Sequence, residues 1–454
     1  MNKRLFIWCL TPALAGFLFG FDTAVISGAE QTIQKLWSLS DGMHGLATSM
    51  ALWGTVIGAM LGGFPADRYG RRKTLIGIGV LYLISALASA LAPDITTFMV
   101  ARFLGGLGVG ASTIAAPLYI AEIAPAELRG RLTGLFQFNI VFGIMVAFIS
   151  NAAISGIGVD AWRWMMGIET APALIFLLGC TKIPRSPRWL LTHRNARDEA
   201  LAVLRQTHPD ASEAQLIVKI LEVAQTEQRL EVAQTEQRPE VAQADKPRFW
   251  TRKLRRPIML AILIAFFNQL SGINAVVFFA PRIFELTGLG EQAALLQSIG
   301  IGVTNLVFTM VGLLLIDRLG RRTLLVIGSF GYIVSLGLCS FAFNSETYAI
   351  VPACIFAFIA AHAIGQGAVI WVFISEIFPN QNRAQGQALG SFTHWIFAAS
   401  LTFAFPTVVG AFAPATIFMF FCAMMVLQLF WIRWMVPETK GISLEQMEEH
   451  LKTN

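Results

Sequence analysis

A single carboxylate stands inside the first apolar stretch of the chain. Asp22 follows the run ALAGFLFGF and precedes TAVISG, and no other charged residue lies between Arg4 and Glu30. A carboxylate in such a segment is costly unless it is paired or lines a cavity, so it is a candidate proton carrier. Burial and a nearby cation act on a carboxylate's proton affinity in opposite directions, which lets such a group load and release a proton as its surroundings change. The alternative is a structural ion pair that only holds helices together.

Arg102 is the natural partner of this carboxylate. It lies in the run MVARFLGGLGVG, and it is the one basic residue deep inside the first six apolar stretches. A charge inside a membrane segment normally pairs with an opposite charge. We therefore expect Asp22 and Arg102 to meet between two helices.

The composition predicts that the elements holding these groups are membrane helices. The chain has 454 residues, of which 55% are hydrophobic and only 14% charged, whereas soluble domains carry about 25% charged residues. Apolar stretches of about 20 residues recur from end to end, and a helix of this length crosses the hydrocarbon core of a bilayer. The N-terminus shows no cleavage site, so the first stretch is a retained helix. We expect spans at roughly 6–28, 45–64, 74–92, 97–121, 133–155, 162–183, 257–281, 293–316, 323–343, 347–374, 386–410 and 414–436.

The basic residues predict how these spans are oriented. The net charge of +6 comes from Lys and Arg placed between apolar stretches, which indicates topology and not nucleic-acid binding. If both termini are cytoplasmic, the opposite loops hold only Lys35, Arg163 and Arg282. The cytoplasmic loops then hold Arg68, Arg71, Arg72, Lys73, Arg129, Arg131, Arg318, Arg321, Arg322 and Arg383. Because short cytoplasmic loops are enriched in Lys and Arg, we expect both termini in the cytoplasm and a multi-pass protein of the plasma membrane.

An internal repeat divides the chain into two halves. The segment GGFPADRYGRRK at 62–73 recurs as LIDRLGRRT at 315–323, and EIAPAELRGR at 122–131 recurs as EIFPNQNRAQ at 376–385. A repeat six spans apart is typical of a transporter built from two six-helix bundles. We expect an N-terminal bundle, a cytoplasmic linker with short helices, a C-terminal bundle and a cytoplasmic tail. The corresponding ranges are 1–183, 184–256, 257–436 and 437–454.

The predicted linker contains a tandem duplication. LEVAQTEQR occupies 221–229 and again 230–238, and a third copy begins as PEVAQ at 239–243. Such a segment is either a regulatory or partner-binding helix, or a solvated linker helix that tolerates insertion. Its charge and its poverty in apolar residues favour the second interpretation.

Patterns of other reactive chemistry are missing from the sequence. The five cysteines lie inside apolar stretches without metal-ligand or redox spacing, so we interpret them as packing residues; they are Cys9, Cys180, Cys339, Cys354 and Cys422. The sequence has no metal-spaced set of His and Glu, no nucleophile elbow and no phosphate loop. We expect no enzymatic activity, no metal, and no cofactor, with a proton as the coupling ion.

The ordered motifs resemble those of the sugar porter family of the major facilitator superfamily. The two D-R-x-G-R-R loops are the superfamily signature. The sugar porter motifs are GFDTAVISG at 20–28, ARFLGGLGVG at 101–110, SPRWLL at 186–191, QLSGINAVVFFAP at 269–281 and VPETKG at 436–441. In pattern the chain is similar to bacterial proton–sugar symporters and to the glucose facilitators of animals. The resemblance implies an all-α membrane fold of twelve helices, a sugar substrate, alternating access, and a monomer in the lipid bilayer with no nucleic-acid partner.

The resemblance gives the buried charges a role. In the symporters, an Asp at the place of Asp22 pairs with the Arg of span 4, which is Arg102 here. In the facilitators, the span 1 position is Asn. The pair therefore implies proton coupling.

The same resemblance implies where the sugar binds. A sugar offers many hydroxyls and two apolar ring faces, so its site needs amides and aromatic rings. The candidates inside the spans are Phe19, Gln137, Asn268, Gln269, Asn274, Phe278, Asn305, Trp371, His394 and Trp395. Gln269 and Asn274 would point about 140° apart on a continuous helix, but Gly272 between them loosens it, and span 7 breaks near such a point in the family. For each polar candidate the alternative is a hydrogen bond between helices.

Several candidates depart from the family pattern. Asn268 stands where relatives have the first of two glutamines, Phe278 and Phe279 replace a tyrosine pair, and His394 replaces Gln or Asn. These changes leave the sugar itself open. His394 is either a second titrating group or a neutral hydrogen-bonding residue, and we favour the neutral one. The span 10 run GQGAVIW at 365–371 lacks the prolines of the facilitators, which puts its bending in doubt.

Charged residues at the cytoplasmic ends of the spans are candidates for a gate; they are Asp67, Arg71, Glu122, Arg129, Asp317, Arg321, Glu376 and Arg383. In the family such residues form charge networks across the two halves when the inner side is closed. A single exposed pair contributes roughly 0–1 kcal/mol, so several pairs suit a gate that must open. The alternative is topology alone. Arg185 stands where the family has an acidic residue, which predicts a weaker or rewired network.

The sequence as a whole predicts a proton-coupled symporter that imports a monosaccharide or a related polyol. The first alternative is an uncoupled facilitator in which Asp22 and Arg102 form a structural pair. The second is a sugar sensor derived from a transporter, which would carry a longer cytoplasmic tail. Export of drugs or organic anions is a third, and the amide-rich span 7 argues against it.

Overall fold

The computed structural model describes residues 3–125, 128–207, 249–379 and 382–441, except the side chain of residue 129. All regular structure in these residues is helical. Twelve of the described segments are long and apolar enough to cross a membrane, in the predicted order. The twelve-helix prediction is therefore confirmed. The tandem repeat and the last residues of the tail lie outside the described ranges.

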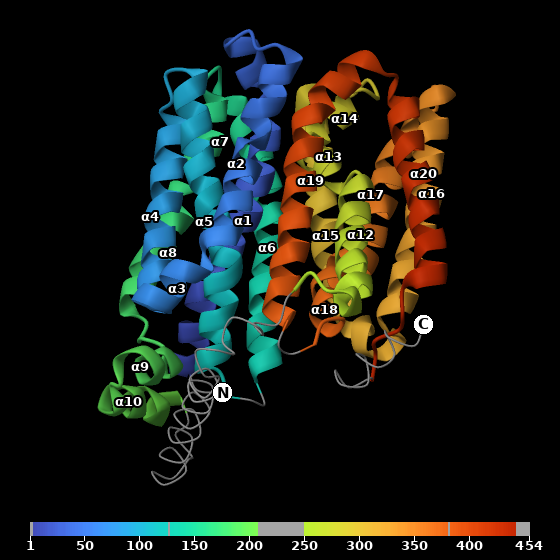
Figure 1. Ribbon diagram of the computed structural model, residues 1–454. Coiled ribbons are helices and arrows are strands. Elements are labelled where there is room, and N and C mark those ends of the chain that lie inside the picture. The colour runs from blue at the N-terminus through green and yellow to red at the C-terminus, as the bar shows by residue number, and fades with distance from the viewer. Residues whose placement is uncertain (1–2, 126–127, 208–248, 380–381, 442–454) are drawn as a thin grey trace.

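The first six spans form one bundle, on the left of Figure 1. Its helices are α1 Lys3–Leu36, α2 Asp41–Leu61, α3 Gly63–Tyr69, α4 Arg71–Ala90, α5 Ile95–Ile123, α6 Arg129–Ile154, α7 Ala161–Gly167 and α8 Thr170–Lys182. Five of the spans are continuous helices in their apolar part. Within that part they contain no glycine with positive φ and no 3₁₀ or π turn. Span 6 comprises α7 and α8, and Ile168 and Glu169 between them keep right-handed helical backbone angles.

The last six spans form the second bundle, on the right of Figure 1. Its helices are α12 Arg255–Leu270, α13 Ile273–Phe278, α14 Ala280–Glu285, α15 Glu291–Leu319, α16 Arg321–Asn344, α17 Val351–His362, α18 Ala368–Glu376, α19 Arg383–Ala411 and α20 Pro414–Met435. Span 7 is divided twice, into α12, α13 and α14. Span 10 is divided by a π-helical turn at Ala363–Gly367, between α17 and α18.

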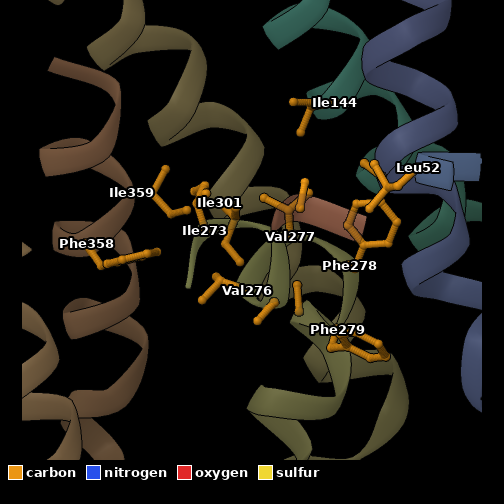
Figure 2. Packing of buried hydrophobic residues seen from close by; sticks show 14 of the residues in the cluster. Leu52, Ile144, Ile273, Val276, Val277, Phe278, Phe279, Ile301, Phe358 and Ile359 are labelled. Atoms are coloured by element: carbon orange, nitrogen blue, oxygen red, sulfur yellow. The ribbon is translucent and has the colours of Figure 1, made fainter. Parts of the chain in front are cut away.

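The two bundles meet along two helix pairs, α2 with α19 and α6 with α15, and α1 also contacts α13 and α14. Glycine lets these backbones approach closely, as small residues do between membrane helices. A Cβ at Gly45 of α2 would lie 1.9 Å from the carbonyl oxygen of Phe403 in α19. Leu52 of α2, Ile144 of α6 and Phe278 of α13 belong to one buried apolar cluster that crosses this interface (Figure 2).

The outward faces of the bundles are apolar. Leu314, Phe330 and Trp434 are 70%, 56% and 73% exposed. Large exposed side chains of this kind are a liability in water, and they are what a lipid-facing surface requires.

Two short helices follow span 6 at the face where α1 begins and α20 ends, which we name the terminal face (Figure 1). They are α9 Pro187–Arg194 and α10 Arg197–Thr207. Ser186 caps α9 by accepting a hydrogen bond from the backbone N–H of Trp189. The Trp189 indole in turn donates to the carbonyl oxygen of Asp67 at 2.8 Å, so α9 is held against the N-terminal bundle.

Candidate functional site

The predicted ion pair is present in the core of the N-terminal bundle. Asp22 of α1 and Arg102 of α5 are 2% and 1% exposed. Nη1 of Arg102 donates to the Asp22 carboxylate, and Nη2 donates to the Asp22 carbonyl oxygen at 2.9 Å. Gly105, one turn after Arg102, lets α5 approach Ser85 of α4 beside this pair, because a Cβ there would lie 2.4 Å from the Ser85 hydroxyl.

A second carboxyl faces this pair. Glu169 lies between α7 and α8, is buried, and is close enough to the Asp22 carboxyl and the Arg102 guanidinium for their charges to interact. Its Oε1 atom has no hydrogen-bond partner among the described residues. Two buried carboxyls and one guanidinium carry one excess negative charge when both carboxyls are ionised. A single proton shared by the carboxyls removes that charge, so the cluster is chemically suited to bind one proton.

Sequence reasoning missed Glu169, although a signal was available. The residue lies inside the apolar stretch predicted at 162–183, so the rule that singled out Asp22 applies to it equally. Its distance to Asp22 was not available from the sequence, because 147 positions separate the two residues and only the packing of α8 against α1 brings them together.

The amides of span 7 form a connected group. Asn274 donates from Nδ2 to Oε1 of Gln269 at 2.6 Å, and Nε2 of Gln269 donates to Oδ1 of Asn268 at 2.9 Å. This contact depends on a break in the helix, since Gly272 between the two residues has φ +87°, a conformation that favours glycine. The expected loosening at Gly272 thus brings together two side chains that a continuous helix would have separated.

Aromatic side chains extend this group. Nε2 of Gln269 lies 3.2 Å from each ring nitrogen of His394, whose ring centroid is 5.0 Å from that of Trp371. The neighbouring Trp395 contacts Phe19 of α1, with ring centroids 5.5 Å apart. Phe19 lies three residues before Asp22, so one turn of α1 connects the charged cluster to the amide and aromatic group. Among the described residues, this contact and that of His44 with Phe279 are the two ring contacts between the bundles.

Three other sugar-site candidates make no hydrogen bond to this group in the described residues. Gln137 of α6 makes no hydrogen bond within the described residues, and Asn305 of α15 accepts only from Thr309, at 3.3 Å. Phe278 is 1% exposed and packs beside Leu52 in the apolar cluster (Figure 2). Hydrogen bonds and ring contacts therefore connect seven of the ten candidates directly.

The predicted gate residues form two matching clusters at the terminal face. In the N-terminal bundle, Arg71 pairs with Glu122 at 2.9 Å and with Asp67 at 3.2 Å. In the C-terminal bundle, Arg321 pairs with Glu376 at 2.7 Å and with Asp317 at 3.2 Å. Each cluster stays within its own bundle, and no ion pair between bundles is present among the described residues of this face.

The matching extends to the segments that follow spans 6 and 12. Ser186 donates to Glu122, and Thr439 donates to Glu376 at 2.6 Å. Gly70 (φ +87°) lies against Trp189, whereas Gly320 (φ +89°) lies against Glu438. The SPRW and PETK motifs thus occupy equivalent places in the two halves.

The remaining gate positions differ from the family pattern in their contacts. Arg185 pairs with Glu199 of α10 at 3.5 Å, and both side chains are exposed. The Nε and Nη2 atoms of Arg383 are buried without a hydrogen-bond partner in the described residues. The side chain of Arg129 lies outside the described structure.

Span 10 contains a π turn and lacks the prolines of the facilitators. Its π turn begins directly after His362 and ends four residues before Trp371. The turn approaches α16 closely, because a Cβ at Gly365 would lie 2.9 Å from the Cα of Gly328. A single π turn is a known place for a helix to bend, so span 10 has a candidate hinge at Ala363–Gly367.

The chain matches one protein family over almost its full length. The model of the family described as sugar (and other) transporter covers residues 8–451. Among curated proteins, the chain is 35% identical to the arabinose-proton symporter of Bacillus subtilis, over 99% of this chain and 95% of that protein. It is 32% identical to the D-xylose-proton symporter of Escherichia coli, over 98% and 96%. It is 33% identical to the glucose transporter GlcP of Staphylococcus epidermidis, over 100% and 98%.

Solved structures give the same result. The xylose transporter XylE from E. coli, in a partially occluded inward-open conformation, has a TM-score of 0.84 at 30% identity, over 97% of this chain and 100% of that chain. Its inward-open conformation also has a TM-score of 0.84, over 98% and 99%. XylE bound to 6-bromo-6-deoxy-D-glucose has a TM-score of 0.77 at the same identity, over 99% of each chain.

Proposed function

We propose that this chain, which belongs to the sugar transporter family, imports a monosaccharide or a related polyol together with a proton. The observation that carries the proposal is the buried cluster of Asp22, Arg102 and Glu169. Phe19, on the same turn of α1 as Asp22, contacts Trp395 of α19, and the adjacent His394 contacts the span 7 amide of Gln269. The names of the relatives support it, because those of the Bacillus and Escherichia proteins describe proton symport of arabinose and xylose.

The charged cluster acts as the proton site in this proposal. A proton entering from one side of the membrane binds to Asp22 or Glu169 and neutralises the excess charge. When Asp22 carries the proton, Arg102 loses an ionic partner on α1 and retains Glu169. The tie between α1 and α5 weakens, and Phe19 on the same turn of α1 is free to move relative to Trp395.

The amide and aromatic group acts as the sugar site. Gln269, Asn274 and Asn268 offer both donors and acceptors, and at present they satisfy each other. A sugar hydroxyl replaces such amide contacts at little cost, because one hydrogen bond is exchanged for another. Trp371, Trp395 and Phe19 supply apolar surface for the ring faces, and His394 acts as a neutral hydrogen-bonding residue. Gln137, Asn305 and Phe278 join the site when the bundles close around the sugar.

The two bundles move as units around this centre. We propose bundle boundaries at 1–183 and 257–436, a cytoplasmic linker between them, a cytoplasmic tail from 437, and both termini in the cytoplasm. The gate residues of the terminal face, including Arg71 with Glu122 and Arg321 with Glu376, join across the bundles when that face closes. The protein works as a monomer in the bilayer, with the proton as its only coupling partner.

An uncoupled facilitator is the second candidate. Arg102 donates to the Asp22 carbonyl oxygen as well as to its carboxylate, which is also what a purely structural tie between α1 and α5 requires. The two candidates make different predictions for transport driven by a proton gradient.

Transport into proteoliposomes separates them. Radiolabelled hexoses, pentoses and inositol are offered to the purified protein with and without an imposed proton gradient. Accumulation of one sugar above its outside concentration only when the gradient is present supports symport and names the substrate. Equal rates and equal final levels in both conditions contradict the coupling and leave a facilitator. Failure of every sugar and polyol to cross contradicts the substrate class itself.

A further inference from the structure

The bundles are tied together by side chains at the face opposite the termini. Glu30 near the end of α1 is fully buried, and Arg282 of α14 holds it with two parallel bonds. Nε of Arg282 donates to Oε1 of Glu30 and Nη2 donates to Oε2, each at 3.0 Å. A bidentate, charge-assisted contact of this kind is among the stronger and more directional ones in proteins.

Neighbouring groups complete the contact on both sides. Nη2 of Arg282 also donates to Oε1 of Gln34 at 2.6 Å, and Gln31 donates to Glu285 at 3.0 Å. Every one of these bonds joins α1 to α14. His44 of α2 lies 2.8 Å from Oε2 of Glu30, so it positions the carboxylate from within the N-terminal bundle.

The surroundings of the contact differ on its two flanks. Below it, Phe278 packs with Leu52 (Figure 2), and the Phe279 ring faces that of His44 with centroids 6.1 Å apart. Beside it lies a polar cavity of about 360 Å³ between α1, α14 and α15. The contact therefore lies over an apolar layer that includes Phe278, Phe279 and Leu52, which we name the apolar seal. Water reaches the edge of the contact, where the Arg282 side chain is 19% exposed.

The described residues of the terminal face hold no equivalent contact. The ion pairs of Arg71 and Arg321 remain inside their own bundles, and no polar side-chain contact joins the bundles there in the described residues. Neither Glu30 nor Arg282 belongs to the motifs on which the family resemblance depends. Any motion that separates α1 from α14 must break the bidentate pair and leave a buried carboxylate with His44 as its remaining partner.

We propose that Glu30 and Arg282 form a latch that keeps the face opposite the termini closed, and that its strength sets how the protein divides its time between its two facing states. This inference rests on alternating access as proposed above. It does not depend on which sugar is carried or on proton coupling.

Cysteine labelling measures the state of this face directly. Leu52→Cys places a thiol in the apolar seal, where the native side chain is 3% exposed. A maleimide is added to the protein in lipid nanodiscs, so that both faces meet the reagent and the result does not depend on membrane orientation. The protein without Leu52→Cys gives the background from the five buried cysteines.

The latch variants are compared in this background. Arg282→Gln removes the cation, and Glu30→Gln with Arg282→Gln removes both charges, so the double variant leaves no unpaired buried carboxylate. We expect each to raise the labelling rate of Cys at position 52 by at least about tenfold, and Arg282→Lys to give an intermediate rate. Asp160→Asn is the matched control, because its 3.6 Å pair with Arg163 lies at the same face, exposed and within one bundle.

The comparison has clear outcomes against the proposal. An unchanged labelling rate in a folded double variant overturns the latch, and so does an equal increase in Asp160→Asn. If Arg282→Gln alone fails to fold, the double variant and Arg282→Lys still decide. No sugar or proton gradient is used, so a failure here is distinct from a failure of the proposed symport.

Discussion

The two bundles share one plan and differ in what they bury. The N-terminal bundle encloses charges, namely Asp22, Arg102 and Glu169, in helices that run almost unbroken. The C-terminal bundle encloses neutral amides and aromatic rings, and it breaks its helices where those groups lie. The comparison indicates that a proton site needs fixed, desolvated partners, whereas a sugar site needs polar groups that can be rearranged.

The backbone beside the charged cluster supports this interpretation. Ile168 and Glu169, between α7 and α8, keep right-handed helical angles. In the C-terminal bundle, the helix is interrupted at Gly272, near Asn274, and by the π turn before Trp371. Of the described residues that we assign to function, those of the C-terminal bundle are the ones beside which the chain departs from a regular α-helix.

The largest expected effect is the loss of coupling in Asp22→Asn. Asn keeps an oxygen for Arg102 but binds no proton, so a proton gradient no longer drives accumulation. If one proton moves with each sugar, a difference of one pH unit across the membrane drives about a tenfold accumulation of sugar. The Asp22→Asn variant should show no such accumulation. Counterflow exchange of sugar in proteoliposomes should remain. Full accumulation by this variant, with Asp160→Asn as the control, would contradict a proton site in the N-terminal bundle.

Removing the cation should affect folding before transport. Arg102→Gln leaves two buried carboxyls facing each other without a positive charge, and breaking a buried pair in this way costs about 3–5 kcal/mol. The double variant Arg102→Gln with Asp22→Asn should recover part of this loss, because it removes one carboxylate. Thermal unfolding in detergent measures both. An Arg102→Gln variant as stable as the native protein would show that the charges are not desolvated.

A change in the amide group should affect affinity and leave coupling intact. Gln269→Ala removes the side chain that connects Asn274, Asn268 and His394. Unsatisfied partners cost about 1–3 kcal/mol, so we expect sugar binding to weaken by roughly 10–100-fold. The number of protons moved per sugar should stay the same. A changed proton-to-sugar ratio would show that the division of labour between the bundles is wrong.

The break in span 7 can be tested at its glycine. In Gly272→Ala the residue must adopt φ +87°, and its Cβ would lie 2.7 Å from the Phe421 ring. A left-handed conformation alone costs about 1–2 kcal/mol for a residue with a Cβ. Gly134→Ala in α6 is the control, since nothing lies within 4 Å of a Cβ there. Equal melting temperatures for both variants would contradict a required break.

The smallest expected effect concerns pH at the face opposite the termini. Burial raises the pKa of Glu285, and the nearby carboxylates of Glu291 and Glu30 raise it further. The hydrogen bond from Gln31 and the charge of Lys35 lower this pKa, but the net shift is upward. A carboxyl whose pKa is raised in the closed form binds protons more tightly there than when open to water. Lower pH therefore favours closure, and the bias fades as pH rises through the raised pKa.

The labelling of Cys at position 52 reports this effect. The rate should fall modestly as pH is lowered, once corrected for the reagent's own pH dependence. Glu285→Gln should remove the change, although His44, Glu30, Arg282 and Asp41 remain nearby as charged or titratable groups. A pH response that persists in Glu285→Gln would assign it to one of those groups.

The sequence contained most of the fold and part of the site. The spans, the repeat and the pairing of Asp22 with Arg102 follow from hydropathy and charge, because a bilayer permits few alternatives. The loosening at Gly272 was also predictable from residue type. The contact of Glu169 with Asp22 and the pair of Glu30 with Arg282 were not, since the latter residues are 252 positions apart and only helix packing determines their approach.

The gate residues also show what the sequence predicts and what depends on helix packing. Charge and spacing predicted that Arg71, Glu122, Arg321 and Glu376 would gather at one face. They did not predict whether the pairs would form within a bundle or between bundles, because one sequence encodes both facing states. Which pairs form depends on a small free-energy difference between the two facing states. Side chains at the face opposite the termini contribute to that difference.

The matching caps of the two halves have a consequence for how the protein is made. In the first half, Ser186 and Trp189 close their bundle as soon as the ribosome has passed span 6. In the second half, the backbone N–H groups of Arg321 and Arg322 donate hydrogen bonds to the carboxylate of Glu438. Glu438 follows all twelve spans, so these bonds form only after the last span has been made. Synthesis therefore completes the first bundle early, whereas the second bundle lacks the hydrogen bonds of Glu438 until the last span has been translated.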